Sequence, residues 1–172
     1  MKYFNGFSLQ NEEVFFEPYL IQDAYSVAGF SYGAQQALEY VYHTQERVDR
    51  LMLLSPAFFQ NQKESFLRMQ LRYFQTAKHA YIEQFLTNVV LPASLDLSPY
   101  VKEGSFDQLE SLLYYRWEEK KLQEVIERGT TIEVFLGGSD QIIDGMNAFD
   151  FFKTLCPTYL IKDAGHILKV KQ

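Results

Sequence analysis

A single serine lies between two glycines in the stretch GFSYG, residues 29–33. The preceding residues, 24–30, are small or apolar and predict a short strand, and residues 32–44 carry apolar side chains at helical spacing. A sharp strand-to-helix turn with this G-x-S-x-G pattern is a nucleophile elbow. Its glycines let strand and helix approach closely, and its serine hydroxyl projects above the sheet. The stretch therefore predicts that Ser31 is a nucleophile at the carboxyl end of a strand.

A serine hydroxyl needs a neighbouring base and an acid that orients the base. The chain has three histidines. His166 lies in DAGHIL, directly after the predicted strand 158–162, from which a loop can reach over the sheet edge. His43 ends the helix after the elbow, where a cation is common at a helix C-terminus, and His79 falls in a helical region. We therefore expect His166 to be the base.

The orienting acid should follow an intermediate strand, and Asp140 follows the predicted strand 131–136 in the stretch VFLGGSDQII. Asp144 is the nearest alternative, but it lies another turn away and is expected to face solvent or to cap the next helix. Asp150 and Asp163 are expected at the surface. We therefore predict that Asp140 is the acid.

The predicted nucleophile, acid and base occur in the chain order Ser31, Asp140, His166. Acyl transfer by such a triad also needs backbone amides that stabilise a negatively charged oxygen, the oxyanion hole. One donor should be the amide of Tyr32, because it follows the nucleophile. The amide of Phe7 is the second candidate, in the early loop YFNGFSLQ, which is also compatible with a simple Asn-Gly turn.

These side chains need strands and helices that bring them to one sheet edge. Strands are predicted at residues 2–4, 24–30, 51–54 (within 47–58), 130–138 and 158–162. Helices are predicted at 11–20 with Asn11 as its cap, 32–44, 105–129 and 146–155, with one or two more between 59 and Pro92. Alternating strands and helices predict an α/β fold with a short, mostly parallel sheet of about five strands flanked by helices. Residues 59–128 interrupt this alternation. They predict a helical lid, inserted after the second strand that follows the elbow, within a single domain of residues 1–172.

Composition narrows the class of protein. The 172 residues carry a formal net charge of −6, which disfavours a nucleic-acid surface. The single cysteine, Cys156, cannot form an internal disulfide, which fits a reducing compartment. The amino terminus lacks the apolar core of a signal peptide, and no segment is apolar over the length of a membrane span. We expect a soluble cytoplasmic protein without a metal or organic cofactor.

The motifs and their order resemble the α/β-hydrolase superfamily over nearly the whole chain. More narrowly, they resemble the pimeloyl-acyl-carrier-protein methyl ester esterases of bacterial biotin synthesis. The stretch NGFSLQNEEVF is similar to the His-Gly-aromatic oxyanion loop of those enzymes, with Asn5 in place of the usual histidine. GFSYG, GGSDQII and AGHIL match their triad segments. The resemblance implies a reduced α/β-hydrolase fold and a serine carboxylesterase that hydrolyses the methyl ester of a pimeloyl chain held by acyl carrier protein. It carries over Ser31, Asp140 and His166 as the triad, and Phe7 and Tyr32 as the oxyanion donors.

The chain departs from that family in length. Only residues 1–30 precede Ser31, far fewer than in typical members. The leading strands and one strand–helix unit between the oxyanion loop and the elbow are therefore expected to be missing. Because a short sheet leaves an edge strand exposed, and exposed edges favour pairing, we expect a monomer or a weak dimer.

The predicted lid combines positive charge with aromatic residues. Arg68 and Arg72 share one helical face with Lys78 close by, in a chain that is acidic overall. Such a face suits an acidic partner such as acyl carrier protein, or it is simply a solvated face. Four lid side chains either line an acyl tunnel or form the core of the lid: Phe66, Leu71, Phe74 and Phe85.

Two other functions remain open at this point. A thioesterase or general acyl-ester hydrolase would use the same triad. A non-catalytic module that binds a carrier or a small ligand is the third hypothesis, and the intact triad motifs argue against it.

Overall fold

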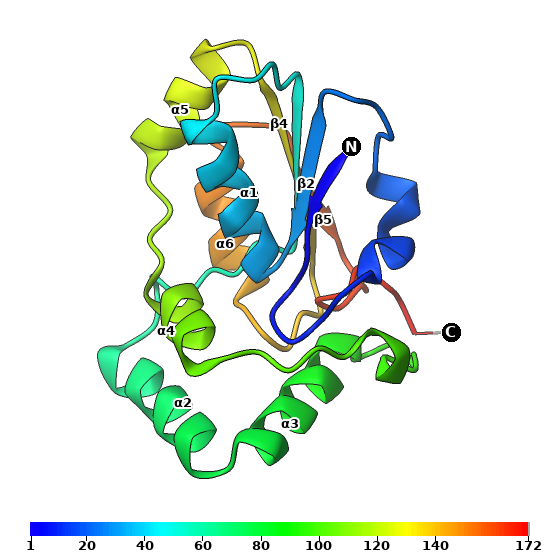
Figure 1. The fold of residues 1–172 in the computed structure, drawn as a ribbon, viewed down its shortest axis with the longest axis vertical. Helices are drawn as coiled ribbons and strands as arrows, with labels where there is room; N and C mark the ends of the chain where they lie inside the picture. Colours follow the sequence, from blue (N-terminus) through cyan, green and yellow to red (C-terminus); the bar gives the residue numbers. More distant parts are fainter. Residues whose placement is uncertain (172) are drawn as a thin grey trace.

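A single five-stranded sheet forms the centre of the computed structural model, which describes residues 1–171 (Figure 1). The strands are β1 (Lys2–Phe4), β2 (Ser26–Phe30), β3 (Arg50–Leu54), β4 (Thr131–Gly137) and β5 (Thr158–Ile161). All neighbouring strands are parallel, and their spatial order β1-β2-β3-β4-β5 is the order of the chain. The expected short sheet of five strands is confirmed, and it is wholly parallel.

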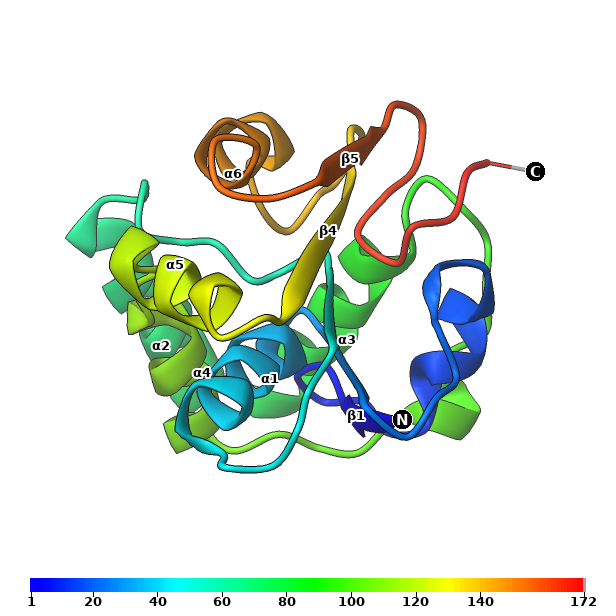
Figure 2. The same ribbon diagram turned by 90° about the horizontal axis from the view of Figure 1, so that it is seen from above.

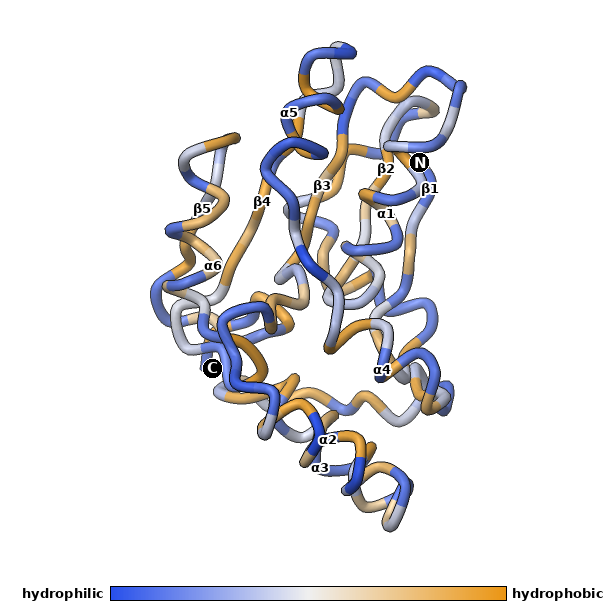
Figure 3. Tube along the Cα trace, turned by 90° about the vertical axis from the view of Figure 1, so that its left-hand side faces the viewer, coloured by the Kyte–Doolittle hydropathy of each residue, from blue (hydrophilic) through white to orange (hydrophobic). Residues whose placement is uncertain are grey.

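Helices cover both faces of this sheet, which fits the largely apolar sequence of its central strands, such as residues 51–54 of β3. The helices α1 (Tyr32–His43), α5 (Glu119–Glu127) and α6 (Gly145–Phe152) lie on one side. The 3-10 helix η1 (Glu12–Tyr19) and the C-terminal loop lie on the other (Figure 2). All five residues of β2 are buried, and hydrophobic positions follow β2, β3 and β4 through the interior (Figure 3). A rigid, buried sheet therefore carries the loops at its edge.

The helical insertion lies across one end of the sheet. It contains α2 (Glu64–Thr76), α3 (Lys78–Val90), the short 3-10 helix η2 (Ser98–Tyr100) and α4 (Phe106–Tyr114), all connecting β3 to β4 (Figure 1). The insertion thus follows the first strand after the elbow, and the expectation that it follows the second was wrong. The last helix of the predicted insertion, α5, packs beside α1, so the part that covers the strand ends is α2–α4.

The stretch 105–129, predicted as one helix, is two helices with a break at residues 115–118. Trp117, in the break, is buried. Its backbone N–H donates to Gln60 Oε1 at 2.7 Å, and its indole Nε1 donates to the Ala57 carbonyl at 2.9 Å. A continuous helix would occupy the Trp117 amide with its own ladder and could not offer it to Gln60. The break therefore results from contacts with residues far away in the chain.

Asn11 occupies the N-cap position of η1, as predicted, but it does not cap the helix through its side chain. Asn11 has a left-handed backbone (φ 58°), and its side chain makes no cap hydrogen bond to η1. Its backbone N–H instead donates to Asn5 Oδ1 at 2.9 Å. Asn tolerates this conformation better than most residues do, so it serves the loop before η1.

Within residues 1–171, no helix is both long enough and apolar enough to cross a membrane. The same residues contain no cluster of three or more His, Cys, Asp or Glu side chains arranged to hold a metal ion.

Candidate active site

The turn between β2 and α1 holds Ser31 in a conformation that side chains rarely adopt, with φ 55° and ψ −111°. Such strain persists only where the surroundings fix it. The Ser31 N–H donates to the Leu54 carbonyl at 2.9 Å, and the Ser31 carbonyl accepts from the Ala57 N–H at 3.1 Å. The backbone of Ser31 is therefore fastened to the chain that leaves β3.

The two glycines of this turn are required by close backbone contacts. A Cβ at Gly29 would lie 2.1 Å from the Gly33 carbonyl oxygen, and a Cβ at Gly33 would lie 2.0 Å from the Phe4 carbonyl oxygen. Both distances are far below van der Waals contact. The spacing of glycines around Ser31 thus follows from the contact between β2, α1 and the end of β1.

Loops after β4 and β5 bring an acid and a base to this serine. His166 Nε2 lies 2.8 Å from Ser31 Oγ, and His166 Nδ1 lies 2.6 Å from Asp140 Oδ2. The side chains of His166 and Asp140 are 0% and 1% exposed, and Ser31 is 3% exposed. The three residues that the sequence placed far apart therefore form one continuous hydrogen-bonded chain, shielded from water.

The Asp140 carboxylate is oriented by its own loop. Its Oδ1 accepts the backbone N–H groups of Ile142 at 2.7 Å and Ile143 at 3.1 Å, which leaves Oδ2 for His166. With Oδ2 accepting the proton at Nδ1, the neutral ring presents an unprotonated Nε2 to the Ser31 hydroxyl. This is the arrangement that a general base requires.

The other acids and histidines lie elsewhere. Asp144 caps α6 by accepting the Asn147 N–H at 3.0 Å. Capping of the next helix was one of the two roles expected for it. Asp150 pairs with Lys153, and Asp163 is exposed. His43 is the exposed last residue of α1, and His79 is exposed on α3.

Two backbone amides are available as oxyanion donors. Tyr32 is the first residue of α1, so no carbonyl one turn earlier accepts its N–H. The Phe7 N–H donates to no backbone or side-chain group among residues 1–171. The Phe7 ring is buried and packs against Phe74 and Phe85 at centroid distances of 6.1 and 5.4 Å. The oxyanion loop therefore lies directly beneath the lid helices.

A cavity of about 300 Å³ lies between the lid helices and the loop after β4, and we name it the lid cavity. Gln141 and Ile142, which follow Asp140, line it, as does Phe85, which contacts Phe7. The complete lining contains no charged side chain: Phe59, Phe66, Gln70, Tyr73, Tyr81, Gln84, Phe85, Asn88, Leu109, Leu112, Leu113, Gln141 and Ile142.

The four predicted tunnel residues divide into two pairs. Phe66 and Phe85 line the lid cavity. Leu71 and Phe74 are buried within the main hydrophobic core and do not line it, so they stabilise the lid.

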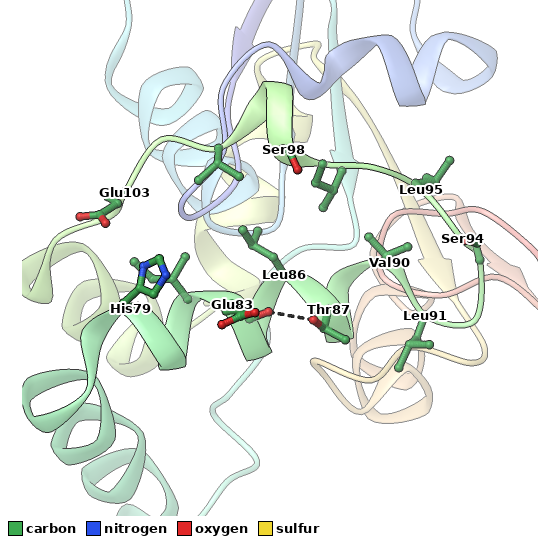
Figure 4. Close-up of a pocket in the computed structure, with 14 residues that line it drawn as sticks. His79, Glu83, Leu86, Thr87, Val90, Leu91, Ser94, Leu95, Ser98 and Glu103 are labelled. Carbon is green, nitrogen blue, oxygen red and sulfur yellow. Dashed lines mark hydrogen bonds between the residues drawn. The ribbon is translucent and has the colours of Figure 1, made fainter.

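A second hollow, of about 560 Å³, runs along the outer side of α3 (Figure 4). The chain from Leu91 to Glu103 forms its other wall, and none of the triad residues lines it. Thr87 faces this outer groove, whereas the next residue, Asn88, lines the lid cavity. The helix α3 thus separates the two hollows.

The predicted basic face is exposed and partly neutralised. Lys78 Nζ lies 3.1 Å from Glu103 Oε2, and Arg68 Nε lies 3.8 Å from Glu64 Oε1. Arg72 is exposed and has no acidic partner within ion-pair distance in the described part of the chain. Arg72 is therefore the cation of this face that is most available to a partner.

Sequence reasoning missed Glu12, which is 0% exposed beneath the oxyanion loop. Burial raises the pKa of its carboxyl to about 7. The stretch NEEVFF offers two consecutive glutamates, and nothing in its pattern distinguishes the buried Glu12 from the half-buried Glu13.

Comparisons of sequence alone find no matching protein-family model and no matching curated protein. Comparisons of structure do. An esterase from Exiguobacterium antarcticum superposes with a TM-score of 0.64 at 16% identity, covering 82% of this chain and 59% of that one. The carboxylesterase CesB from Bacillus subtilis gives 0.57 at 18% identity, covering 94% and 59%.

An α/β-hydrolase fold protein from Burkholderia ambifaria gives a TM-score of 0.54 at 16% identity, covering 83% of this chain and 59% of that one. The chain thus spans less than two thirds of the length of these structures. The likeness establishes that the chain has the α/β-hydrolase fold.

Proposed function

We propose that this protein is a serine carboxylesterase. The observation that carries the proposal is the hydrogen-bonded chain from Asp140 through His166 to Ser31, built on a strained elbow. The burial of these three side chains and the order of their hydrogen bonds suit a hydroxyl that is activated by an imidazole. Esterases are also among the proteins that share the fold.

The reaction follows from these positions. His166 Nε2 takes the proton from Ser31 Oγ as the oxygen bonds to the ester carbonyl carbon. The Phe7 and Tyr32 amides stabilise the negative charge on the carbonyl oxygen. His166 then gives the proton to the departing alkoxide, which leaves as an alcohol. A water molecule, deprotonated by His166, attacks the acyl-enzyme and releases the acid and the Ser31 hydroxyl.

For the substrate, we propose the methyl ester of a pimeloyl chain on acyl carrier protein, with methanol as the leaving alcohol. The sequence resemblance supports this choice, and so does the lid cavity. Its uncharged lining suits a neutral, largely apolar chain. The exposed Arg68, Arg72 and Lys78 would then meet the acidic carrier in the cytoplasm.

The direct test uses purified protein and methyl-pimeloyl-carrier. Mass spectrometry should detect a product lighter by one CH₂, still attached to the carrier, and the Ser31→Ala protein should form none. The gene should also restore biotin-free growth to a strain that lacks its own methyl ester esterase, and Ser31→Ala should not. Hydrolysis of short aryl esters by Ser31→Ala at the wild-type rate would refute the chemistry itself.

The same experiment separates the other hypotheses. A thioesterase with this triad would cut the bond between acyl chain and carrier and release a free carrier thiol. A non-catalytic module would leave the substrate intact, and a fluorophosphonate probe would not label Ser31.

A further inference from the structure

Glu12 is a buried carboxyl group that directly contacts the oxyanion loop. It is the first residue of η1, and its Oε1 accepts the Gly6 N–H at 2.6 Å and the Tyr3 hydroxyl at 3.3 Å. Its Oε2 is buried and has no partner within residues 1–171. Burying a carboxyl group that is only half satisfied costs stability. This loss of stability suggests that the Glu12 carboxyl has a function that compensates for it.

The role follows from the geometry of the peptide units on either side of Gly6. The Gly6 N–H belongs to the unit before the Gly6 Cα, and Glu12 holds that unit. The Gly6 carbonyl belongs to the unit after it and accepts the Leu9 N–H at 3.2 Å. The bond between Gly6 and Phe7 is trans, so the Phe7 N–H points opposite to the Gly6 carbonyl.

A glycine by itself would allow these two units many relative orientations. With one unit fastened to Glu12 and the other to Leu9, the direction of the Phe7 N–H is set. The neighbouring residue Asn5 closes the same loop by accepting the Asn11 N–H. Of these fastenings, only the one from Glu12 comes from a side chain in the interior under the sheet edge.

We propose that Glu12 is a positioning residue of the oxyanion loop. Its carboxyl oxygen fixes the Gly6 amide, and thereby keeps the Phe7 N–H aimed at the oxygen that becomes negative during acyl transfer. The inference rests on the proposed serine esterase chemistry. It requires an acceptor at this position, and it does not require the negative charge.

The test compares Glu12→Ala, which removes the acceptor, with Glu12→Gln, which keeps a carbonyl oxygen. Glu13→Ala is the matched control, because Glu13 lies in the same turn, is half-buried and makes no side-chain hydrogen bond to the loop. The measurements are kcat and KM for an aryl butyrate, the inhibition constant of a trifluoromethyl ketone, whose adduct carries the oxyanion, and the rate of Ser31 labelling by a fluorophosphonate.

For Glu12→Ala we expect kcat to fall about 10- to 100-fold, with KM within about 3-fold, because a misaligned donor acts only in the transition state. The ketone should bind more weakly and labelling should slow, each by a similar factor. Glu12→Gln and Glu13→Ala should stay within about 3-fold of wild type in every measurement. A purely structural role would lower the melting temperature without moving the ketone constant relative to KM.

Should Glu12→Ala not fold, Glu12→Asp takes its place, since it withdraws the acceptor from Gly6 by one CH₂. An intermediate loss of kcat and of ketone affinity is then expected. Wild-type kcat and ketone affinity in a folded Glu12→Ala or Glu12→Asp protein would overturn the inference while leaving the esterase proposal intact. If wild-type Ser31 is not labelled at all, the esterase proposal and the role of Glu12 are both refuted. If it is labelled but no ester is cleaved, the labelling rates alone decide the role of Glu12.

Discussion

The proposed chemistry depends on a few atoms whose directions are fixed by their neighbours. Ser31 Oγ is raised by a positive φ, and Asp140 is left one free oxygen by the amides of Ile142 and Ile143. His166 lies between them with no exposure to solvent. Because each group is held before substrate binds, little reorganisation is needed during the reaction.

Replacing Asp140 by Asn tests this orientation. The Asn side-chain amide would donate to Nδ1, so the ring would carry its proton on Nε2 and could not accept the Ser31 proton. We expect kcat for aryl esters to fall about 1,000- to 10,000-fold, with the fold retained. Asp144→Asn is the control, since Asp144 only caps α6, and it should keep kcat within about 3-fold. A wild-type kcat in Asp140→Asn would exclude the proposed roles of Asp140 and His166.

Glu12 should also make stability depend on pH. Its pKa is about 7 in the folded protein and about 4.5 when exposed. Between these values the folded state holds a proton that the unfolded state has lost, so the free energy of unfolding falls as pH rises through this window. Above it, the burial of the charge is fully unfavourable. The total decrease is roughly 2–4 kcal/mol.

Urea denaturation of wild type and Glu12→Gln at about pH 5 and about pH 8 measures how much Glu12 changes the free energy of unfolding between the two pH values. Glu12→Gln should gain stability relative to wild type on going to the higher pH, and Glu13→Gln should not. Parallel pH profiles for wild type and Glu12→Gln would show that the Glu12 carboxyl does not titrate in this range.

At the scale of elements, the site is formed where the ends of three strands, β2, β4 and β5, meet under the lid helices. The elbow needs β1, β2 and α1 to touch backbone to backbone at Gly29 and Gly33. The lid helices α2–α4 then close over Ser31 and His166, which are buried.

Adding a methyl group at Gly33 should break the elbow contact. Its Cβ would lie 2.0 Å from the Phe4 carbonyl oxygen, which is backbone and cannot move aside cheaply. Gly33→Ala should therefore lower stability by more than about 4 kcal/mol or prevent folding. Gly129→Ala is the contrast. Gly129 has φ 96° and open space around it, so only backbone strain of about 1–2 kcal/mol applies. Equal melting temperatures for the two variants would contradict this account.

The lid cavity can be tested by filling it from α3. Asn88→Trp should lower kcat/KM for an aryl hexanoate by about 10-fold or more, and much less for an aryl acetate, because only the longer chain needs the cavity. Thr87→Trp places the same ring in the groove on the outer side of α3. It should leave kcat/KM unchanged for both the hexanoate and the acetate. A chain-length effect from Thr87→Trp, with none from Asn88→Trp, would place the acyl chain in the outer groove.

The sequence predicts every strand, the elbow and the convergence of Ser31, Asp140 and His166, because these depend on local patterns and on the rule that parallel strand ends share an edge. It does not predict the break at Trp117, whose partners Gln60 and Ala57 lie far away in the chain. Nor does it separate Glu12 from Glu13, since burial beneath a loop leaves no periodic pattern in an eight-residue 3-10 helix.

At the scale of the whole molecule, charge is unevenly distributed. The chain carries a net −6, yet α2 exposes Arg68 and Arg72 on the side opposite to its residues that line the lid cavity. A positive face on an acidic protein directs an acidic partner to one place, mainly by raising the association rate. A carrier bound there would contact the same helix, α2, whose opposite side lines the cavity proposed for its acyl chain.

Arg72→Glu should reduce kcat/KM for methyl-pimeloyl-carrier by about 10-fold at low salt and leave hydrolysis of small aryl esters unchanged. The difference between variant and wild type should shrink as salt is added. Lys120→Glu, an equal charge reversal on the exposed surface of α5, should behave as wild type with the carrier. Equal losses in the two variants would point to a general effect of net charge.

The strands lie side by side in the same order as they occur in the chain, and this order affects how the protein folds. Residues 5–25, 31–49 and 138–157 form three connections of similar length, whereas residues 55–130 form one roughly four times as long. In a freely jointed chain that one closure costs only about 1 kcal/mol more than each of the others. During synthesis, β1, β2 and β3 can pair as they emerge, while β4 must wait for the entire helical segment. Ser31 is then in place well before Asp140 and His166, so the proposed triad cannot be complete until the last strand has docked.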